Sequence, residues 1–271
     1  MKIGYLAPAG SFSEEATLSR FSDVAPYSSF ELVDVLARGE IEAAVLPVEN
    51  SIEGPVNWVL DLLSRNHMPF SISAEIVWTV KQNLIGLGRI SDIQTVYSIP
   101  QALGQCRGFL DKIGVETRDT DSTSAAVRLV AERKDQKIAA IGSKRAAEIY
   151  GLPIITEDIS DARNNKTRFI VLGKERAGTT GRDKTSLIFG FTMEEANRSG
   201  ALSNVMVIFA ALDISMTMVV SRPTGDALGN YIFFVDIEGH RQDGKVRVAL
   251  EAIAAKTSFL RVLGSYPKAK E

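Results

Sequence analysis

Residue types that often carry chemistry are scarce in this chain of 271 residues. A single cysteine, Cys106, excludes an internal disulfide and any cysteine-rich zinc site. The only two histidines, His67 and His240, are far apart in the sequence and give a metal few ligands. We therefore expect no metal site.

Charge of one sign and long apolar runs are missing as well. The formal net charge is −2, so the chain lacks the basic excess that nucleic-acid binding requires. No apolar stretch reaches transmembrane length, and the N-terminus becomes turn-like at Pro8-Ala9-Gly10, too early for a signal peptide. We expect a cytoplasmic protein that binds neither nucleic acid nor membrane.

What is present is ordinary globular material, 45% hydrophobic and 24% charged, with length for two or three compact units. From residue 1 to about residue 173, short apolar runs alternate with helical patterns, which is typical of an α/β region. The expected strands are 3–6, 43–48, 70–80, 94–98, 115–118, 137–141, 154–155 and 167–172. The expected helices are 14–20 (capped by Ser13), 31–38, 56–63 and two that begin at Pro100 and Ser122.

Residues 70–80 alternate apolar and polar side chains, as a long strand crossing between two lobes would. The second lobe should span about residues 81–155, within a region of residues 1–173. Two such lobes enclose a cleft, where small ligands usually bind.

The polar, glycine-bearing stretch 174–183 is typical of a linker, so a second domain should span residues 184–271. Its expected order is a strand at 185–191, a helix at 200–212, strands at 215–220 and 231–236, a helix at 244–256 and a strand at 259–264. This is a ferredoxin-like βαββαβ unit. It has few acid–base groups, so a regulatory or assembly role suits it better than catalysis.

The most informative segment is Asn164-Asn165-Lys166-Thr167-Arg168-Phe169, which places a hydroxyl, a cation and an aromatic ring together where an apolar strand begins. This grouping predicts a site for a small anion, although Thr-Arg-Phe is also a good strand sequence. An isolated arginine such as Arg168 could equally form an ion pair on the sheet.

Other polar side chains follow predicted strands, where α/β folds present their ligand sites. They are Ser11, Ser13, Asn50, Ser51 and, at the start of a helix in the second lobe, Thr123. Capping of the helices that follow is the alternative explanation for each of them. Cys106 falls on an apolar helical spacing, which indicates a core residue.

The chain resembles the prephenate dehydratases, with a C-terminal ACT domain. The resemblance rests on Gly10-Ser11-Phe12-Ser13, on Leu46-Pro47-Val48-Glu49-Asn50-Ser51 with Glu53-Gly54, and on Thr167-Arg168-Phe169. It implies a two-lobed catalytic region similar to periplasmic-binding-protein-like folds, and conversion of prephenate to phenylpyruvate without a cofactor. It also implies Thr167, Arg168 and Phe169 as catalytic residues, and Ser11, Ser13, Asn50, Ser51 and Glu53 as substrate contacts. From their places in the sequence we add Thr123, at the helix start in the second lobe, and Asn164, beside Thr167.

The second domain resembles ACT domains in two motifs that bind phenylalanine, which would make L-phenylalanine an allosteric inhibitor. The residues implied are Gly200, Ala201, Leu202, Asn204, Ser221, Arg222 and Pro223. Two positions depart from the family pattern, Val220 where a glutamate usually precedes Ser-Arg-Pro, and Ile99 where a histidine is common.

The helix expected at 200–212 is apolar nearly all round, which favours a homodimer or homotetramer through the ACT and catalytic domains. Two alternatives stay open. One is an arogenate dehydratase, and the other is a two-lobed amino-acid sensor without catalysis.

Overall fold

The computed structural model describes residues 2–65, 69–196, 198–225 and 229–269, and the chain forms two compact units. Unit 1 comprises residues 1–46, 50–52 and 78–167, and unit 2 comprises residues 47–49, 53–77 and 168–271. Strands β3 (Ala43–Asn50), β5 (Ser71–Thr79) and β11 (Lys166–Gly173) contribute residues to both units.

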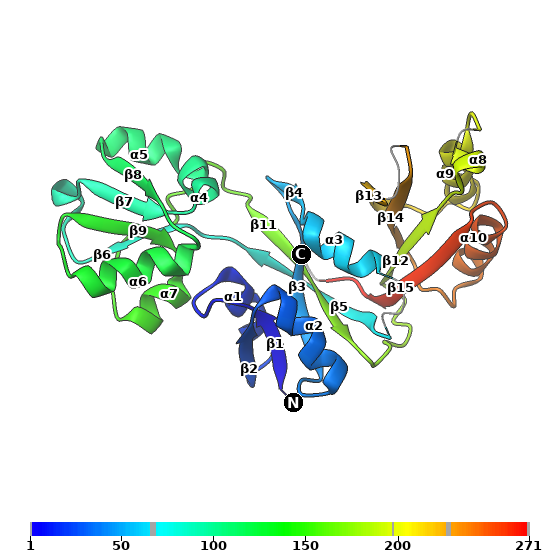
Figure 1. Ribbon diagram of the computed structural model, residues 1–271, viewed down its shortest axis with the longest axis horizontal. Helices are drawn as coiled ribbons and strands as arrows, with labels where there is room; N and C mark the ends of the chain where they lie inside the picture. The colour runs from blue at the N-terminus through cyan, green and yellow to red at the C-terminus, as the bar shows by residue number, and fades with distance from the viewer. Residues whose placement is uncertain (1, 66–68, 197, 226–228, 270–271) are drawn as a thin grey trace. The chain divides into compact units, whose positions relative to one another are not determined.

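Unit 1 contains two groups of strands with helices beside them, the first parallel and the second mixed, since β6 is antiparallel to β9 and β10 (Figure 1). In the first group β1 pairs in parallel with β2 and β3, so that Ile3 lies opposite Val24 and Ala43. The second is a five-stranded sheet of order β10-β6-β9-β7-β8. The helices and strands that lie wholly in unit 1 are β1 (Ile3–Leu6), α1 (Phe12–Leu18), β2 (Val24–Tyr27), α2 (Ser29–Arg38), β6 (Asn83–Gly86), the 3-10 turn η1 (Ile90–Asp92), β7 (Thr95–Ser98), α4 (Pro100–Gln105), α5 (Arg107–Ile113), β8 (Glu116–Asp119), α6 (Thr123–Arg133), β9 (Ile138–Gly142), α7 (Lys144–Tyr150) and β10 (Ile154–Thr156).

Helices cover both faces of the five-stranded sheet (Figure 1). On one face Leu103, Cys106 and Leu110 of the α4–α5 segment pack against the strands. On the other, Val127 of α6 and Ala146 of α7 do so. Apolar runs such as Ile138–Gly142 are buried throughout, as strands covered on both faces must be.

Unit 2 contains a four-stranded antiparallel sheet of order β13-β14-β12-β15, with helices α9 and α10 packed on one face. The chain order β12, α9, β13, β14, α10, β15 is the predicted βαββαβ arrangement, with the short α8 added. Within the same unit β3, β11 and β5 are neighbours in that order. The helices and strands that lie wholly in unit 2 are β4 (Gly54–Pro55), α3 (Asn57–Ser64), β12 (Asp183–Gly190), α8 (Met193–Ala196), α9 (Ala201–Ala211), β13 (Met216–Pro223), β14 (Tyr231–Glu238), α10 (Gly244–Ala254) and β15 (Phe259–Pro267).

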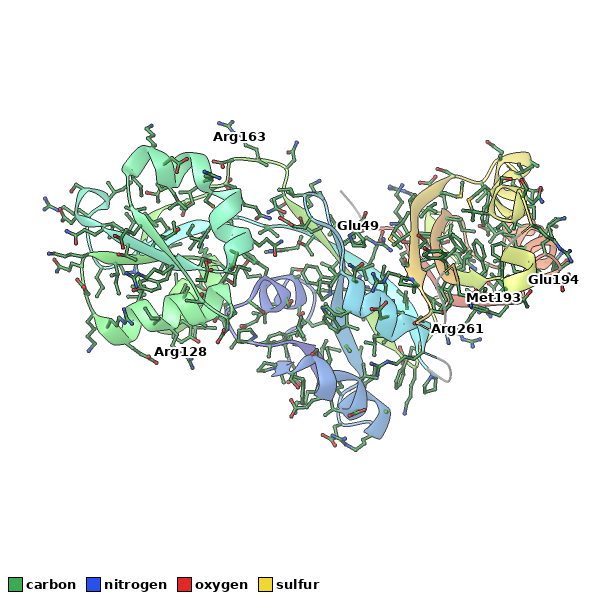
Figure 2. All side chains as sticks on the ribbon, turned by 45° about the horizontal axis from the view of Figure 1, so that its top comes forward. Glu49, Arg128, Arg163, Met193, Glu194 and Arg261 are labelled. Carbon is green, nitrogen blue, oxygen red and sulfur yellow. The ribbon has the colours of Figure 1, made fainter. Side chains whose placement is uncertain are left out.

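Two contacts fix the sheet of unit 2 against residues from the first half of the chain. Arg261 on β15 donates to the backbone carbonyls of Leu63 and Arg65 at the end of α3 (Figure 2). A Cβ at Gly264 would lie 2.2 Å from the backbone oxygen of Ile72 on β5, so β15 and β5 touch backbone to backbone. Only glycine allows that approach.

The predicted fold class is confirmed, with corrections at element ends. The first helix begins at Phe12 and is capped by Ser11, whose hydroxyl accepts from the Glu14 amide, so the prediction of Ser13 as the cap was wrong. Strands β2 and β6 and helix α7 were not predicted. The division into residues 1–173, 174–183 and 184–271 stays a prediction.

Candidate active site

Thr167 and Asn50 meet through their side chains although 117 positions separate them. The Asn50 side-chain nitrogen donates to the Thr167 hydroxyl oxygen at 2.9 Å. The Asn50 side-chain oxygen accepts from the backbone amide of Ile52, which fixes the amide's orientation. A hydroxyl that accepts in this way keeps its own proton available for donation elsewhere.

The side-chain amides of Asn165 and Gln105 extend this hydrogen-bonded group. The Asn50 side-chain nitrogen also donates to the side-chain oxygen of Asn165 at 2.7 Å, and Asn165 in turn donates to Gln105 at 3.0 Å. Asn165 is 1% exposed. Neither Asn165 nor Gln105 was among the predicted site residues, and the amide pair 164–165 was the only signal for the first of them.

Ser51 and Asn164 lie beside this group and brace its backbone. The Ser51 hydroxyl donates to the Asn164 carbonyl and accepts from the Lys166 amide, both at 2.9 Å. Helix α3 begins after Val56 without any side-chain cap, so the alternative that Asn50 and Ser51 cap it is wrong. Substrate contact by Ser51 and by Asn164, whose side chain is exposed, stays a prediction.

A second group in unit 1 is built around the turn at Gly10. Gly10 has a positive φ of 80°, its amide donates to the Glu14 carboxylate at 2.5 Å, and its carbonyl accepts from the Ser143 hydroxyl at 2.6 Å. Arg145 donates to the other oxygen of Glu14 at 2.9 Å. This turn is therefore fastened to α7.

The same turn is fastened to α6, since the Ser124 hydroxyl donates to the Ala9 carbonyl. Thr123, the predicted site residue, is the first residue of α6 and is buried, as is Ser13. Substrate binding by Ser11, Ser13 and Thr123 stays a prediction.

Arg168 lies in a buried cluster of unit 2. Its Nε donates to Glu75 at 2.9 Å, and its Nη2 lies 2.5 Å from the Asp236 carboxylate and 3.0 Å from the Tyr266 hydroxyl. Lys184 donates to the same oxygen of Glu75 at 2.8 Å. The Arg168 guanidinium therefore has protein partners, and its predicted pairing with a substrate carboxylate stays a prediction.

The charges in this cluster stabilise each other. Burial alone raises the pKa of the Glu75 carboxyl, but the nearby Arg168 and Lys184 cations outweigh it and bring that pKa below its ordinary value. Burial likewise lowers the pKa of Arg168, yet Asp236, Tyr266 and Glu75 raise it overall. Burial, followed by the Asp236 charge, raises the pKa of the Tyr266 hydroxyl.

The acids within the matched motifs are not buried. The Glu49 side chain, which Figure 2 labels, is 40% exposed and lies 3.6 Å from the Arg168 Nη1. Glu53 is exposed. Phe169 is 1% exposed and belongs to the core.

The predicted phenylalanine-binding residues lie at one helix start and one strand end of unit 2. Gly200 precedes α9 with a positive φ of 87°, and its carbonyl accepts from the Asn204 amide at 2.9 Å. Ser221, Arg222 and Pro223 end β13, as Ala201 and Leu202 begin α9. Arg222 makes a two-pronged ion pair with Asp61 of α3, at 2.8 and 2.7 Å.

Other residues singled out in the sequence have structural surroundings. Cys106 is fully buried in the core of unit 1, as predicted. His67 lies outside the described residues, among which no group of three or more histidine, cysteine and acidic side chains is placed to hold a metal ion. Within the described ranges, no helix has both the length and the apolar character needed to span a membrane.

These features define a class of protein, an α/β unit with a hydroxyl–amide site joined to a ferredoxin-like unit. Comparison with known proteins finds the same two parts. The family model for prephenate dehydratase matches residues 3–177, and the model for the ACT domain matches residues 195–255. The chain belongs to the prephenate dehydratase family and carries a C-terminal ACT domain.

Individual relatives support this assignment. The prephenate dehydratase of Methanocaldococcus jannaschii is 38% identical over 274 residues, which cover 97% of both chains. A structure of prephenate dehydratase from Arthrobacter aurescens in complex with L-Phe has a TM-score of 0.90 at 28% identity, covering 99% of this chain and 90% of that one.

The fold is not confined to one named activity. The structure of GqqA, described as a novel type of quorum quenching acylase, has a TM-score of 0.89 at 25% identity, covering 99% of this chain and 98% of that one. Function must therefore be argued from the site.

Proposed function

We propose that this chain converts prephenate to phenylpyruvate, carbon dioxide and water, and that L-phenylalanine inhibits it through the ACT domain. The observation that carries the proposal is the 2.9 Å hydrogen bond from the Asn50 amide to the Thr167 hydroxyl. It joins the two motifs of the first region, 117 positions apart, into one site.

The proposed reaction is driven by the substrate itself. Loss of the ring carboxylate and of the ring hydroxyl produces an aromatic ring, which drives the reaction without a redox cofactor or metal. The protein must orient the substrate and stabilise the departing oxygen. The Thr167 oxygen accepts from Asn50, which leaves the Thr167 proton to be donated to a second partner, and we propose that this partner is the leaving hydroxyl. A threonine hydroxyl is too weak an acid for full proton transfer, so its role is electrostatic, and the proton that converts the departing hydroxide to water comes from solvent.

The test compares three variants in a prephenate assay that measures phenylpyruvate. Thr167→Ala should lower kcat by about 10²- to 10³-fold, the usual effect of losing one donor to a developing negative charge. Thr167→Ser should retain most activity because it keeps the hydroxyl. Thr117→Ala, at an exposed position on β8, is the matched control.

Asn50→Ala completes the series, because it frees the Thr167 hydroxyl without removing it. We expect kcat to fall while the fold, followed by circular dichroism, is retained. Full turnover in both Thr167→Ala and Asn50→Ala would contradict the proposed site.

Inhibition is proposed on the resemblance of 200–204 and 221–223 to ACT motifs and on the positive φ of Gly200, which permits close backbone approach. Calorimetry should show that Gly200→Val and Asn204→Ala weaken phenylalanine binding. If both variants bound phenylalanine as tightly as the unaltered chain, Gly200 and Asn204 would not belong to the effector site. If phenylalanine bound to the unaltered chain without slowing prephenate turnover, Val220 would be implicated in the loss of inhibition.

The same assay separates the alternatives. Arogenate offered in place of prephenate tests the aminated substrate, and binding of either without product would indicate a sensor. We further propose that the enzyme is cytoplasmic. We also propose that it forms a homodimer or homotetramer, and light scattering on the purified protein would measure the oligomeric state.

A further inference from the structure

The buried ion cluster consists of five side chains from five strands. They are Glu75 of β5, Arg168 of β11, Lys184 of β12, Asp236 of β14 and Tyr266 of β15. The last three strands belong to the four-stranded sheet that carries the ACT-like motifs. The first two strands contribute residues to both compact units.

The buried members of the cluster are balanced in charge. Two cations face two carboxylates, and these four side chains are at most 10% exposed, while the Glu49 carboxylate, 40% exposed, lies 3.6 Å from the Arg168 Nη1. Glu75 also accepts from the Ala269 amide at 2.9 Å, and Tyr266 shares a 2.6 Å hydrogen bond with Ser186. A buried network with this many partners has few alternative arrangements, so it holds its members in fixed positions.

Arg168 is the central member. Its guanidinium contacts Glu75, Asp236 and Tyr266 at 2.5–3.0 Å, while the Met218 sulfur lies 3.7 Å from its Nη1. A guanidinium held this way fixes the backbone that carries it. That backbone begins one peptide bond after Thr167, and the boundary between the two compact units falls at this bond.

We propose that Arg168 is a positioning residue: the buried ion cluster fixes the start of β11, and the ACT-domain sheet thereby governs the orientation of the Thr167 hydroxyl. In this proposal Arg168 acts on turnover through Thr167, which replaces its predicted pairing with a substrate carboxylate. The proposal rests on the proposed function and adds the route by which its regulation reaches the site.

The physical basis is the rigidity of this buried network. Lys184, Asp236 and Tyr266 move with the ACT-domain sheet, so an effector that shifts this sheet must also shift Arg168 or break buried ion pairs. Breaking them leaves charges unpaired in a dry interior, which is costly. The low-cost response is a movement of Arg168 together with the residue that precedes it.

The test uses two variants of the full chain and one control. Tyr266→Phe removes a single hydroxyl that bonds to Arg168 and Ser186 and leaves all four charges in place. Asp236→Asn removes a charge opposite Arg168. Asp213→Asn is the matched control, since Asp213 lies in the same unit with its side chain 99% exposed. Circular dichroism establishes that each variant is folded, and Tyr266→Phe decides the question if Asp236→Asn does not fold.

The first readout is the ratio of KM for prephenate with and without saturating phenylalanine. In the unaltered chain this ratio should fall in the usual range of allosteric coupling, roughly 5- to 150-fold, and in Tyr266→Phe it should approach about one. Calorimetry should show phenylalanine still bound to that variant. A purely structural role would lower stability and leave the ratio unchanged, which would overturn the proposal.

The second readout needs no turnover. Amide hydrogen exchange of residues 166–173 should change when phenylalanine alone is added to the unaltered chain and to Asp213→Asn, but not to Tyr266→Phe. An equal response in all three proteins, or no phenylalanine binding to the unaltered chain, would overturn the proposal. Lack of phenylpyruvate production would contradict only the proposed function, because exchange would still report the coupling.

Discussion

The substitution Glu75→Gln should destabilise this protein more than any surface change. The Glu75 side chain is 1% exposed and accepts hydrogen bonds from Arg168, Lys184 and the Ala269 amide at 2.8–2.9 Å. A glutamine has the same size but carries no charge, and its amide nitrogen would face one of these donors. Lys184 would then lose its buried carboxylate partner, and Arg168 would keep only Asp236 and the partly exposed Glu49.

The expected cost follows from that imbalance. Removing one partner of a buried ion pair costs about 3–5 kcal/mol in the free energy of unfolding. In a chain of this size class about 1 kcal/mol lowers Tm by about 2–4 °C, so Tm should fall by about 6–20 °C. Urea unfolding followed by circular dichroism measures the same loss at constant temperature.

Glu238→Gln provides the matched control. Glu238 makes a 2.6 Å ion pair with Lys268, with side chains 45% and 32% exposed, and such exposed pairs contribute only about 0–1 kcal/mol. If Glu75→Gln unfolded at the same urea concentration as Glu238→Gln, the cluster would contribute no more than a surface pair. That result would refute the reasoning.

The pH dependence has a definite sign. Because the folded-state pKa of Glu75 lies below its ordinary value of 4.5, the cluster's contribution is present above that pH. It is lost as the pH falls through the folded-state pKa and Glu75 takes up a proton. The unaltered protein should therefore lose stability in acid more steeply than Glu75→Gln, when unfolding is compared between pH 6 and pH 3.

Two further predictions concern unit 1. Burial raises the pKa of the Cys106 thiol to about 12, so the thiol should stay protonated at pH 8 and react with a disulfide reagent only after unfolding in urea; rapid labelling of native protein would contradict this. Gly10→Ala should destabilise by about 1–3 kcal/mol, because its φ is positive and its new Cβ would lie 2.8 Å from the Ser124 hydroxyl. Gly39→Ala has the same backbone strain but no atom within 4 Å, so equal urea midpoints for the two variants would exclude the steric part.

Local pattern was enough to predict most elements of the fold. Alternation over residues 70–80 predicted β5, and Pro100 and Ser122 marked the helix starts that the structure has. It failed where local signals compete. Strand β2 contains Pro26, which argues against a strand, and Ser11 and Ser13 are both good caps whose choice depends on how the chain leaves β1.

For the candidate site, the sequence supplied Thr167 and Asn50 but not the side chains around them. Thr167 and Asn50 belong to local motifs, but motifs do not state which side chains meet. Asn165 and Gln105 join them only because tertiary structure brings together positions 60 and 115 residues apart. Arg168 shows the limit most clearly, since its buried partners are 93 residues before it and 68 and 98 residues after it. No local pattern reports such pairings.

The origin of the strands in unit 2 limits how the chain can be divided. A fragment cut at the linker, residues 184–271, would keep the whole βαββαβ order but lose β5 and β11. Lys184, Asp236 and Tyr266 would then face water or each other without Glu75 and Arg168, and Gly264 would lose the backbone of Ile72. The C-terminal module is therefore not a transferable part, and grafting it onto another enzyme would require the two strands that complete it.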